Sequence, residues 1–190
     1  MTLPRLLVII GSTRPGRVGP AFANWFVDRA RAHGGFEVEV ADLAEIDLPM
    51  FNEAKHPKFG DYEHQHTKDW SATVAAADAI VFVVPEYNYG YNAATKNAID
   101  YLSKEWADKA VSFVSYGGIG GGTRAVQQLK QVVTTLRMVP IFESINIPFA
   151  ANHLDEERKV KPSDERDAAA DVMLDELLRV TSLLRPAAFS

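Results

Sequence analysis

The chain contains no cysteine. Disulfide bonds, thiolate metal sites, iron–sulfur clusters and cysteine nucleophiles are therefore excluded. Three of the five histidines, His56, His64 and His66, lie near one another in the sequence. No obvious carboxylate partner accompanies them, so we predict surface histidines and no metal site.

Two further features are missing. No apolar run approaches the roughly 20 residues that a membrane-spanning helix needs. No basic stripe is present either, and the net charge is −5, which argues against a nucleic-acid partner. The first ten residues are interrupted by Pro4 and Arg5 and do not resemble a signal peptide. We therefore expect a cytoplasmic protein with no membrane and no nucleic-acid partner.

Short apolar runs alternate with helical patterns along the chain, and the composition is that of an ordinary globular protein. The predicted strands are Leu6–Ile10, Phe36–Leu43, Ala79–Val84, Ala110–Ser115 and Met138–Phe142. The predicted helices are Pro20–Ala32, Glu63–Ala77, Ala93–Leu102, Thr123–Leu136 and a closing helix that begins near Ser163. The stretch between Ala44 and Tyr62 is expected to be irregular.

This alternation predicts an α/β fold, with a parallel sheet covered by helices on both faces. We expect one domain over residues 1–190, with a flavodoxin-like, doubly wound, five-stranded parallel sheet in the order 2-1-3-4-5. In such a sheet, ligands bind outside the carboxyl ends of the strands. The loops after strands one, three and four are therefore the candidates for function.

The first of these loops, Gly11–Gly19, follows a buried strand and opens a helix. Its free N–H groups and the helix dipole suit an anion, and Ser12, Arg14 and Arg17 add donors. The loop lacks the glycine spacing of a dinucleotide fingerprint and the Gly-Lys-Ser/Thr of a P-loop. We predict a terminal monophosphate site, and the alternative is a glycine-rich turn with surface arginines.

The second loop, Pro85–Asn92, places three tyrosines and two asparagines after a buried strand. Tyrosine supplies a flat face, and backbone and amide groups supply hydrogen bonds for a planar ligand such as a flavin ring. Because no further strand is predicted after this loop, we expect the tyrosines to remain accessible. The alternative is an aromatic cluster that packs into the core.

The third loop has five glycines between Gly117 and Gly122, which lets the backbone approach a ligand closely. Gly120, Gly122 and Ala125 also satisfy a relaxed G-x-G-x-x-A pattern, with Glu143 near the spacing of a ribose-binding acid. That pattern leaves an NAD-binding dehydrogenase as an alternative. In the predicted strand order one mononucleotide can reach all three loops.

Three motifs, GSTRPGR, PEYNYGYNAATKNAIDY and SYGGIGGGTRA, resemble the loop motifs of the NADPH-dependent FMN reductases, a flavodoxin-like family of quinone, azo-dye and metal-oxyanion reductases. The resemblance covers Leu6 to about Phe142. It implies bound FMN, with NADPH or NADH as co-substrate. By this resemblance the cofactor-binding residues are Ser12, Arg14, Arg17 and Val18 at the phosphate, Pro85, Glu86, Tyr87 and Asn88 at the ring, and Ser115, Tyr116, Gly117 and Gly118 at its far edge.

The function implied is an NAD(P)H oxidoreductase with ping-pong kinetics and a small-molecule acceptor, namely a quinone, an azo compound or free flavin. The flavin N5 atom carries the hydride, so no catalytic side chain is predicted. The resemblance also implies a homodimer through the helix Ala93–Leu102, or a homotetramer. A non-enzymatic electron carrier or redox-sensing flavin module is the alternative from another functional class.

Overall fold

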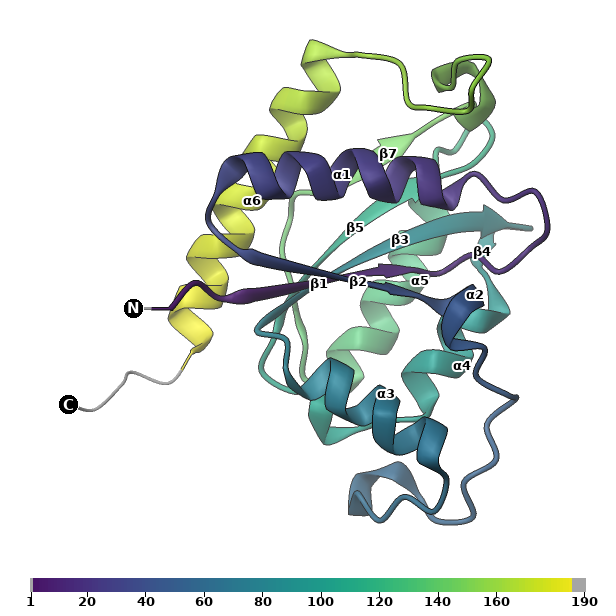
Figure 1. The fold of residues 1–190 in the computed structure, drawn as a ribbon, viewed down its shortest axis with the longest axis vertical. Helices are drawn as coiled ribbons and strands as arrows, with labels where there is room; N and C mark the ends of the chain where they lie inside the picture. The colour runs from purple at the N-terminus through teal and green to yellow at the C-terminus, as the bar shows by residue number, and fades with distance from the viewer. Residues whose placement is uncertain (1, 186–190) are drawn as a thin grey trace.

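The computed structural model describes residues 2–185, and the remaining residues of the predicted 1–190 domain lie outside this description. Helices cover both faces of one twisted sheet (Figure 1). The helix α1 (Gly19–His33) and the helix α6 (Asp164–Leu184) lie on one face. The opposite face carries α3 (Gln65–Ala75), α4 (Ala93–Asp100) and α5 (Thr123–Thr135).

The main sheet is parallel and has the order β2-β1-β3-β5-β6, which confirms the predicted fold class and strand order. The strands are β1 (Arg5–Ile10), β2 (Glu37–Asp42), β3 (Ala79–Tyr87), β4 (Gly90–Tyr91), β5 (Ala110–Tyr116), β6 (Val139–Pro140) and β7 (Ile145–Ile147). The predicted number of five strands is wrong, because the sheet contains seven. The two additional strands arise from a short hairpin and from a break in the last strand.

The predicted fifth strand, Met138–Phe142, is shorter than expected. It survives as β6, and β7 resumes the pairing with β5 further along. Proline at position 140 has no N–H to donate, and such a residue is tolerated only at the edge of a sheet. Between the two strands the Ser112 hydroxyl donates to the Glu143 carbonyl (2.6 Å) and takes the place of a ladder bond.

The unbroken apolar runs are explained by burial on both faces. Leu6, Val8 and Ile10 pack in the core beneath α1 and α6, whereas Leu7 and Ile9 pack in the core beneath α3, α4 and α5. Side chains alternate across a strand, so a strand in the middle of a three-layer fold must be apolar at every position. The second core also buries residues at and beyond the end of α4, namely Ile99, Tyr101, Leu102 and Trp106.

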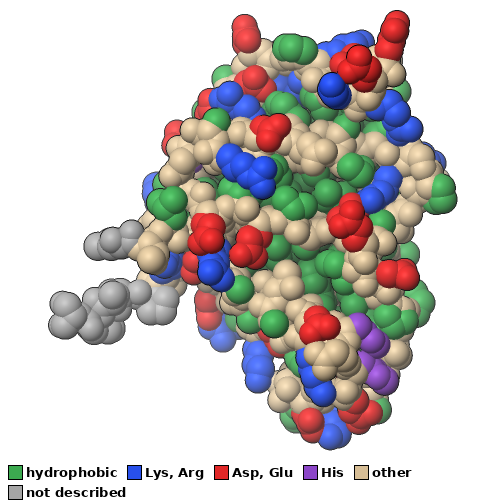
Figure 2. Space-filling view, viewed as in Figure 1, with side chains coloured by type: hydrophobic (Ala, Val, Ile, Leu, Met, Phe, Trp, Pro, Cys, Tyr) green, Lys and Arg blue, Asp and Glu red, His purple; other side chains and the backbone are tan. Residues whose placement is uncertain are grey.

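The edge strand β2 borders the band of hydrophobic side chains that Figure 2 shows between α1 and the helices below. A short helix, α2 (Leu43–Ile46), follows β2 directly, although this region was expected to be irregular. The Asp42 carboxylate accepts from the Ala44 N–H (3.0 Å) and caps this helix. Within residues 2–185, no helix is both long and apolar enough to cross a membrane.

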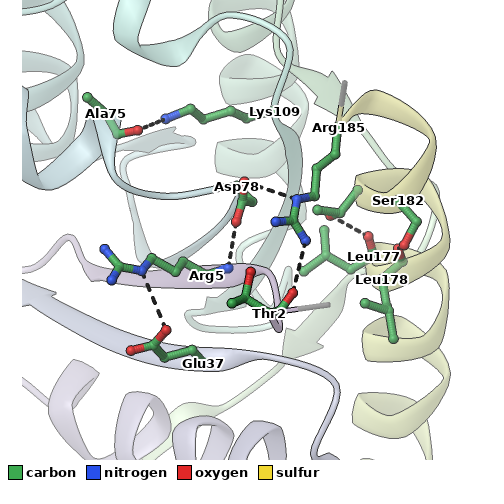
Figure 3. Close-up of polar contacts among 11 residues, drawn as sticks. Thr2, Arg5, Glu37, Ala75, Asp78, Lys109, Leu177, Leu178, Ser182 and Arg185 are labelled. Atoms are coloured by element: carbon green, nitrogen blue, oxygen red, sulfur yellow. Dashed lines mark hydrogen bonds and ion pairs between the residues drawn. The ribbon is translucent and has the colours of Figure 1, made fainter. Parts of the chain in front are cut away.

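At the N-terminal ends of the strands, polar contacts join the strands to the ends of α3 and α6 (Figure 3). Asp78 accepts from the Arg5 N–H (2.8 Å) and pairs with Arg185 at the end of α6 (3.5 Å). Lys109 donates to the carbonyls of Val74 and Ala75, the latter at 3.4 Å, and so caps the end of α3. These contacts stabilise the fold at this end of the sheet, and the candidate functional loops lie at the other end.

Candidate functional site

Three loops meet at the carboxyl ends of β1, β3 and β5, which are neighbours in the sheet. The first loop, the hairpin that contains β4 and the start of α5 lie at this end of the molecule (Figure 1). The parallel register places Ile10 beside Val83, and Val84 beside Ser115, so the loops leave the sheet at nearly the same level.

The first loop ends at the N-terminus of α1, a helix of 15 residues with no side-chain cap and no acidic residue in its first turn. Such a terminus has N–H groups without partners and a positive dipole end. Within residues 2–185 the Val18 N–H has no intramolecular acceptor. The buried Ser12 hydroxyl also has no hydrogen-bond partner there. These are the features of an anion-binding site.

Arg17, which is predicted at the phosphate, makes its observed contacts within the protein. Its guanidinium donates to both carboxylate oxygens of Asp42 (2.5 and 2.6 Å) and to the Ser12 carbonyl (2.7 Å). This pair raises the pKa of Arg17, against the effect of burial. Arg17 therefore connects the first loop to the end of β2, and its positive charge is paired with the Asp42 carboxylate.

The second loop is a tight hairpin rather than the open loop expected, and β3 extends through Tyr87 to pair with β4. Asn88 (φ 50°) and Tyr89 (φ 72°) both have positive φ, which is the backbone of a type I′ turn. Asparagine tolerates this conformation, but tyrosine rarely adopts it. The expectation that no strand follows is wrong, because the chain turns back at Asn88 and Tyr89 and Gly90 pairs with Tyr87. Tyr89 nevertheless remains 65% exposed.

Glu86 connects the hairpin to the third loop. Its carboxylate accepts from the backbone N–H of Arg124 (3.1 Å) and from the Arg124 guanidinium (2.8 Å). The same guanidinium lies 4.0 Å from the centre of the Tyr89 ring, a cation–π contact. Gln128 of α5 also donates to the Tyr89 carbonyl (3.0 Å). These contacts fix the strained hairpin against the start of α5.

The hairpin is also joined to the first loop. Asn92 donates to the Gly11 carbonyl (2.5 Å) and accepts from the Thr95 hydroxyl (2.8 Å). Arg14 lies over the Tyr87 ring, 5.9 Å from its centre. A Cβ on Gly11 would come within 2.3 Å of the Thr95 hydroxyl, so the close contact between these loops requires glycine.

The third loop is held in place by residues of β5 and β7. The Ser115 hydroxyl lies within hydrogen-bond distance of the Gly121 carbonyl (2.9 Å) and the Asn146 side-chain amide (2.8 Å). Its single proton goes to one of these two groups, so the hydroxyl is engaged within the protein. The Gly117 N–H donates to the Ile147 carbonyl (3.2 Å). By contrast, Gly118 is exposed, and a Cβ there would meet nothing within 4 Å. Open space suitable for a ligand therefore adjoins Gly118 rather than Gly117.

Gly122 explains part of the glycine pattern without a ligand. Its φ is +89°, and a Cβ would lie 2.5 Å from the Ser115 Cβ. Close packing of the loop on β5 therefore requires glycine here. The G-x-G-x-x-A pattern that includes Gly122 and Glu143 thus has a structural explanation, and Glu143 contacts Ser112 only through its backbone carbonyl.

Tyr116 lies beneath the first and third loops. Its ring packs against Phe22 (5.3 Å between centroids). Its hydroxyl lies near that of Ser12, but neither makes a hydrogen bond of normal geometry within the described residues. Burial raises the pKa of Tyr116 to about 12, so the hydroxyl stays protonated at neutral pH. A Cβ on Gly19 would come within 2.4 Å of the Ser12 hydroxyl and 2.7 Å of the Tyr116 hydroxyl. The two unpartnered hydroxyls therefore converge at the start of α1.

This arrangement fits a mononucleotide. Unpartnered hydroxyl and N–H donors at the start of α1 suit a phosphate. Tyr87 and Tyr89 offer partly exposed rings nearby that suit a planar group. Of the predicted residues, Pro85 is buried at the end of β3 beside Tyr116, while Arg14, Tyr87 and Asn88 are exposed.

Four residues that organise the site were not predicted. Asp42 holds Arg17, Arg124 holds Glu86, and Asn92 and Asn146 hold the neighbouring loops. Asn92 could have been found, because it is part of the PEYNYGYN motif. The partners of Asp42 and Asn146 lie 25 and 31 residues away and leave no local signal. Among the described residues, no cluster of three or more histidine or acidic side chains is positioned for a metal.

Comparison with known proteins yields consistent matches. The family model described as NADPH-dependent FMN reductase matches residues 4–152. An NAD(P)H-dependent FMN reductase of Schizosaccharomyces pombe is 42% identical over 149 residues, which are 76% of this chain and 74% of that protein. An NAD(P)H:quinone oxidoreductase of Solanum tuberosum is 33% identical, over 65% of this chain and 64% of that protein.

An NADPH azoreductase of a Bacillus species is 32% identical, over 66% of this chain and 66% of that protein. Among solved structures, the flavoenzyme NAD(P)H:(acceptor) oxidoreductase from Paracoccus denitrificans superimposes with a TM-score of 0.76, covering 95% of this chain and 98% of that one. At 19% identity this likeness concerns the fold alone.

Proposed function

Because this chain belongs to the NADPH-dependent FMN reductase family, we propose that it oxidises NADPH or NADH through bound FMN and reduces quinones, azo compounds or free flavin. Membership confirms the resemblance drawn from the sequence, the FMN cofactor and the assignment as an enzyme. The non-enzymatic carrier and the NAD-binding dehydrogenase are therefore set aside. The acceptors named here are those of relatives described as quinone and azo reductases.

The observation that carries the proposal is the convergence of unpartnered donors at the start of α1. Ser12 and Val18 can donate to a terminal phosphate there. Arg17 keeps the loop in place through Asp42, and Arg14 supplies a nearby positive charge on the exposed side. This division of roles refines the predicted phosphate contacts.

When bound, FMN supplies hydride chemistry at its N5 atom, and the protein supplies position and electrostatics. Tyr87 and Asn88 form the exposed tip of the hairpin, and we propose that they border the ring. Within the described residues, the N–H groups of Gly118 and Ile119 have no intramolecular acceptor. These groups can donate to the far edge of the ring and favour its negative charge after reduction.

We further propose that the nicotinamide and the acceptor occupy the same exposed face in turn. Glu86 and Arg124 hold the hairpin and the glycine loop together, so this face stays open without a large rearrangement. Alternate occupation of one face predicts ping-pong kinetics.

Kinetics on the purified holoprotein test this proposal. Anaerobic NADPH or NADH should bleach the flavin absorbance, and a quinone should restore it. Steady-state double-reciprocal plots should then be parallel. A flavin-containing protein that neither nucleotide reduces would contradict the enzyme, and intersecting plots would contradict the ping-pong order.

We also propose a homodimer through the region of α4, with a homotetramer as the alternative. Met50 is 76% exposed, and Phe51 beside it packs on Tyr101 (5.2 Å between centroids) and bonds to Asn97 of α4 (2.8 Å). An exposed apolar surface at this place is what an interface requires. Light scattering should give twice the chain mass of 21.0 kDa. A monomer at micromolar concentration would contradict the assembly.

A further inference from the structure

The segment between β7 and α6 reaches back to the first loop. Residues 154–160 form a hairpin, in which Leu154 pairs with Val160 and Asp155 accepts from the Arg158 N–H (3.0 Å). Arg158 has a positive φ of 63° at the turn, which directs its side chain away from the hairpin. The guanidinium then donates to the carbonyls of Gly16 (2.8 Å) and Arg17 (3.1 Å).

These two carbonyls belong to the loop that faces the predicted phosphate. In a trans peptide the C=O and N–H groups point in opposite directions, and the described chain contains no cis peptide bond. Holding the Arg17 carbonyl therefore turns the Val18 N–H away from Arg158. The bond to the Gly16 carbonyl fixes the preceding peptide, between Gly16 and Arg17, in the same way. The N–H group of that peptide, which belongs to Arg17, donates to the Arg14 carbonyl (3.1 Å).

Few other contacts support the loop between Gly16 and Val18. Arg17 ties the loop to β2 through its side chain, but a cavity of about 540 Å³ separates α1 from the hairpin. Gly16 is exposed, and a Cβ there would meet nothing within 4 Å. The two bonds from Arg158, together with the bond from the Arg17 N–H to the Arg14 carbonyl (3.1 Å), therefore set the peptide orientation between Gly16 and Val18.

We propose that Arg158 is a positioning residue for the phosphate of the bound mononucleotide. By holding the carbonyls of Gly16 and Arg17, it presents the Val18 N–H to the anion, and its own positive charge strengthens the site. Arg158 lies outside residues 4–152, the part matched by the family model. The inference rests on the proposed FMN-dependent function.

The test is a comparison of FMN with riboflavin, which has the same ring without the phosphate. The apoprotein is titrated with each ligand, and binding is followed by flavin fluorescence. Arg158→Ala should raise the Kd for FMN about tenfold, which corresponds to about 1.4 kcal/mol. The Kd for riboflavin should stay within about twofold, because the ring site does not involve Arg158. Arg158→Lys should give an intermediate value, because lysine keeps the positive charge but its ammonium differs in shape and reach from the guanidinium that holds both carbonyls through Nη2.

Lys159→Ala is the matched control. Lys159 lies in the same hairpin and pairs only with Glu157 (3.0 Å), so its loss should leave both ligands unaffected. An unchanged Kd for FMN in Arg158→Ala would overturn the inference, and so would an equal loss of FMN and riboflavin. Failure of the unaltered protein to bind FMN would instead overturn the proposed function. Thermal unfolding of each apoprotein shows that the variants are folded.

Discussion

A buried serine hydroxyl without a partner is expensive in a folded protein. Ser12 has such a hydroxyl, and Tyr116 provides a second one near it. Proteins keep such groups when a ligand uses them. At the scale of single residues, these two atoms are the most direct sign of an anion at the start of α1.

Ser12→Ala tests this reading. The alanine removes a donor to the phosphate but no internal bond, because the hydroxyl has none within residues 2–185. We expect FMN binding to weaken by about 1.5–3 kcal/mol, the range for a hydrogen bond to a charged group. The free energy of unfolding of the apoprotein should stay the same or rise slightly. A clear loss of apoprotein stability in urea would show that Ser12 has an internal partner after all.

Residue types in the motifs indicate a candidate site but do not assign a partner to each side chain. Arg17 was expected at the phosphate, yet its guanidinium is held by Asp42. Ser115 was expected at the ring, yet it holds Gly121 and Asn146. An arginine or serine in a loop offers the same donors to a ligand and to the protein. Only the distance to a competing acceptor decides between them.

At the scale of elements, the third loop shows two kinds of glycine. Gly122 has a φ of +89° and no room for a Cβ, whereas Gly118 has open space beside it. The first glycine serves the packing of the loop on β5, and the second lies on the ligand side. In the sequence, a glycine required for packing cannot be distinguished from a glycine that lies beside a ligand.

Gly122→Ala and Gly118→Ala form a matched pair that separates these requirements. Gly122→Ala should lower the free energy of unfolding by about 2–4 kcal/mol, because it adds backbone strain to a clash with Ser115. Gly118→Ala should change it by less than about 0.5 kcal/mol, as an exposed substitution without contacts does. Chemical denaturation of both apoproteins measures the difference. Equal stability of the two variants would contradict the assigned packing.

The regular elements were largely predictable, because a buried parallel strand requires an unbroken apolar run. The exceptions are instructive. The last strand is broken between Pro140 and Ile145, and the hairpin at Asn88–Tyr89 forms although a tyrosine occupies a left-handed position. Local propensity disfavours that turn. Contacts of Tyr89 with Arg124 and Gln128, which lie far along the chain, compensate for it.

At the scale of the whole molecule, the two ends of the sheet have separate tasks. The carboxyl ends carry the site, and the N-terminal ends carry Asp78, Lys109 and Arg185 (Figure 3). Strand β3 has nine residues, so these ends are separated by about 25–30 Å. Changes at the N-terminal end should therefore affect stability without affecting the cofactor.

The effect of Lys109 on stability as a function of pH tests this separation. Burial lowers the pKa of Lys109 to about 8, while an exposed lysine in the unfolded chain has a pKa near 10.4. Between these values the unfolded chain binds more protons than the folded one, so stability rises with pH. We expect the unaltered protein to gain about 1–2 kcal/mol from pH 7.5 to pH 9.5 relative to Lys109→Met. Urea unfolding of both proteins at the two pH values measures this difference.

The comparison of the two proteins cancels the titration of groups that they share. The tyrosines with raised pKa values, including Tyr116, ionise above this pH range. The Kd for FMN should be the same in Lys109→Met and in the unaltered protein. Parallel pH profiles would show that Lys109 is not desolvated, and a changed Kd would contradict the separation of the two ends.

The amino-acid sequence by itself determined the layered fold, the strand order and the three loops that meet at one edge. These follow from local patterns, namely apolar runs, helical periodicity and glycine-rich turns. Only the tertiary structure decided which polar groups remain available to a ligand. Arg17, Ser115 and Glu86 find partners within the protein, whereas Ser12 and the Val18 N–H do not. The reason is physical: a hydrogen bond depends on distance and direction in space, and the residues that compete for these groups are distant in sequence.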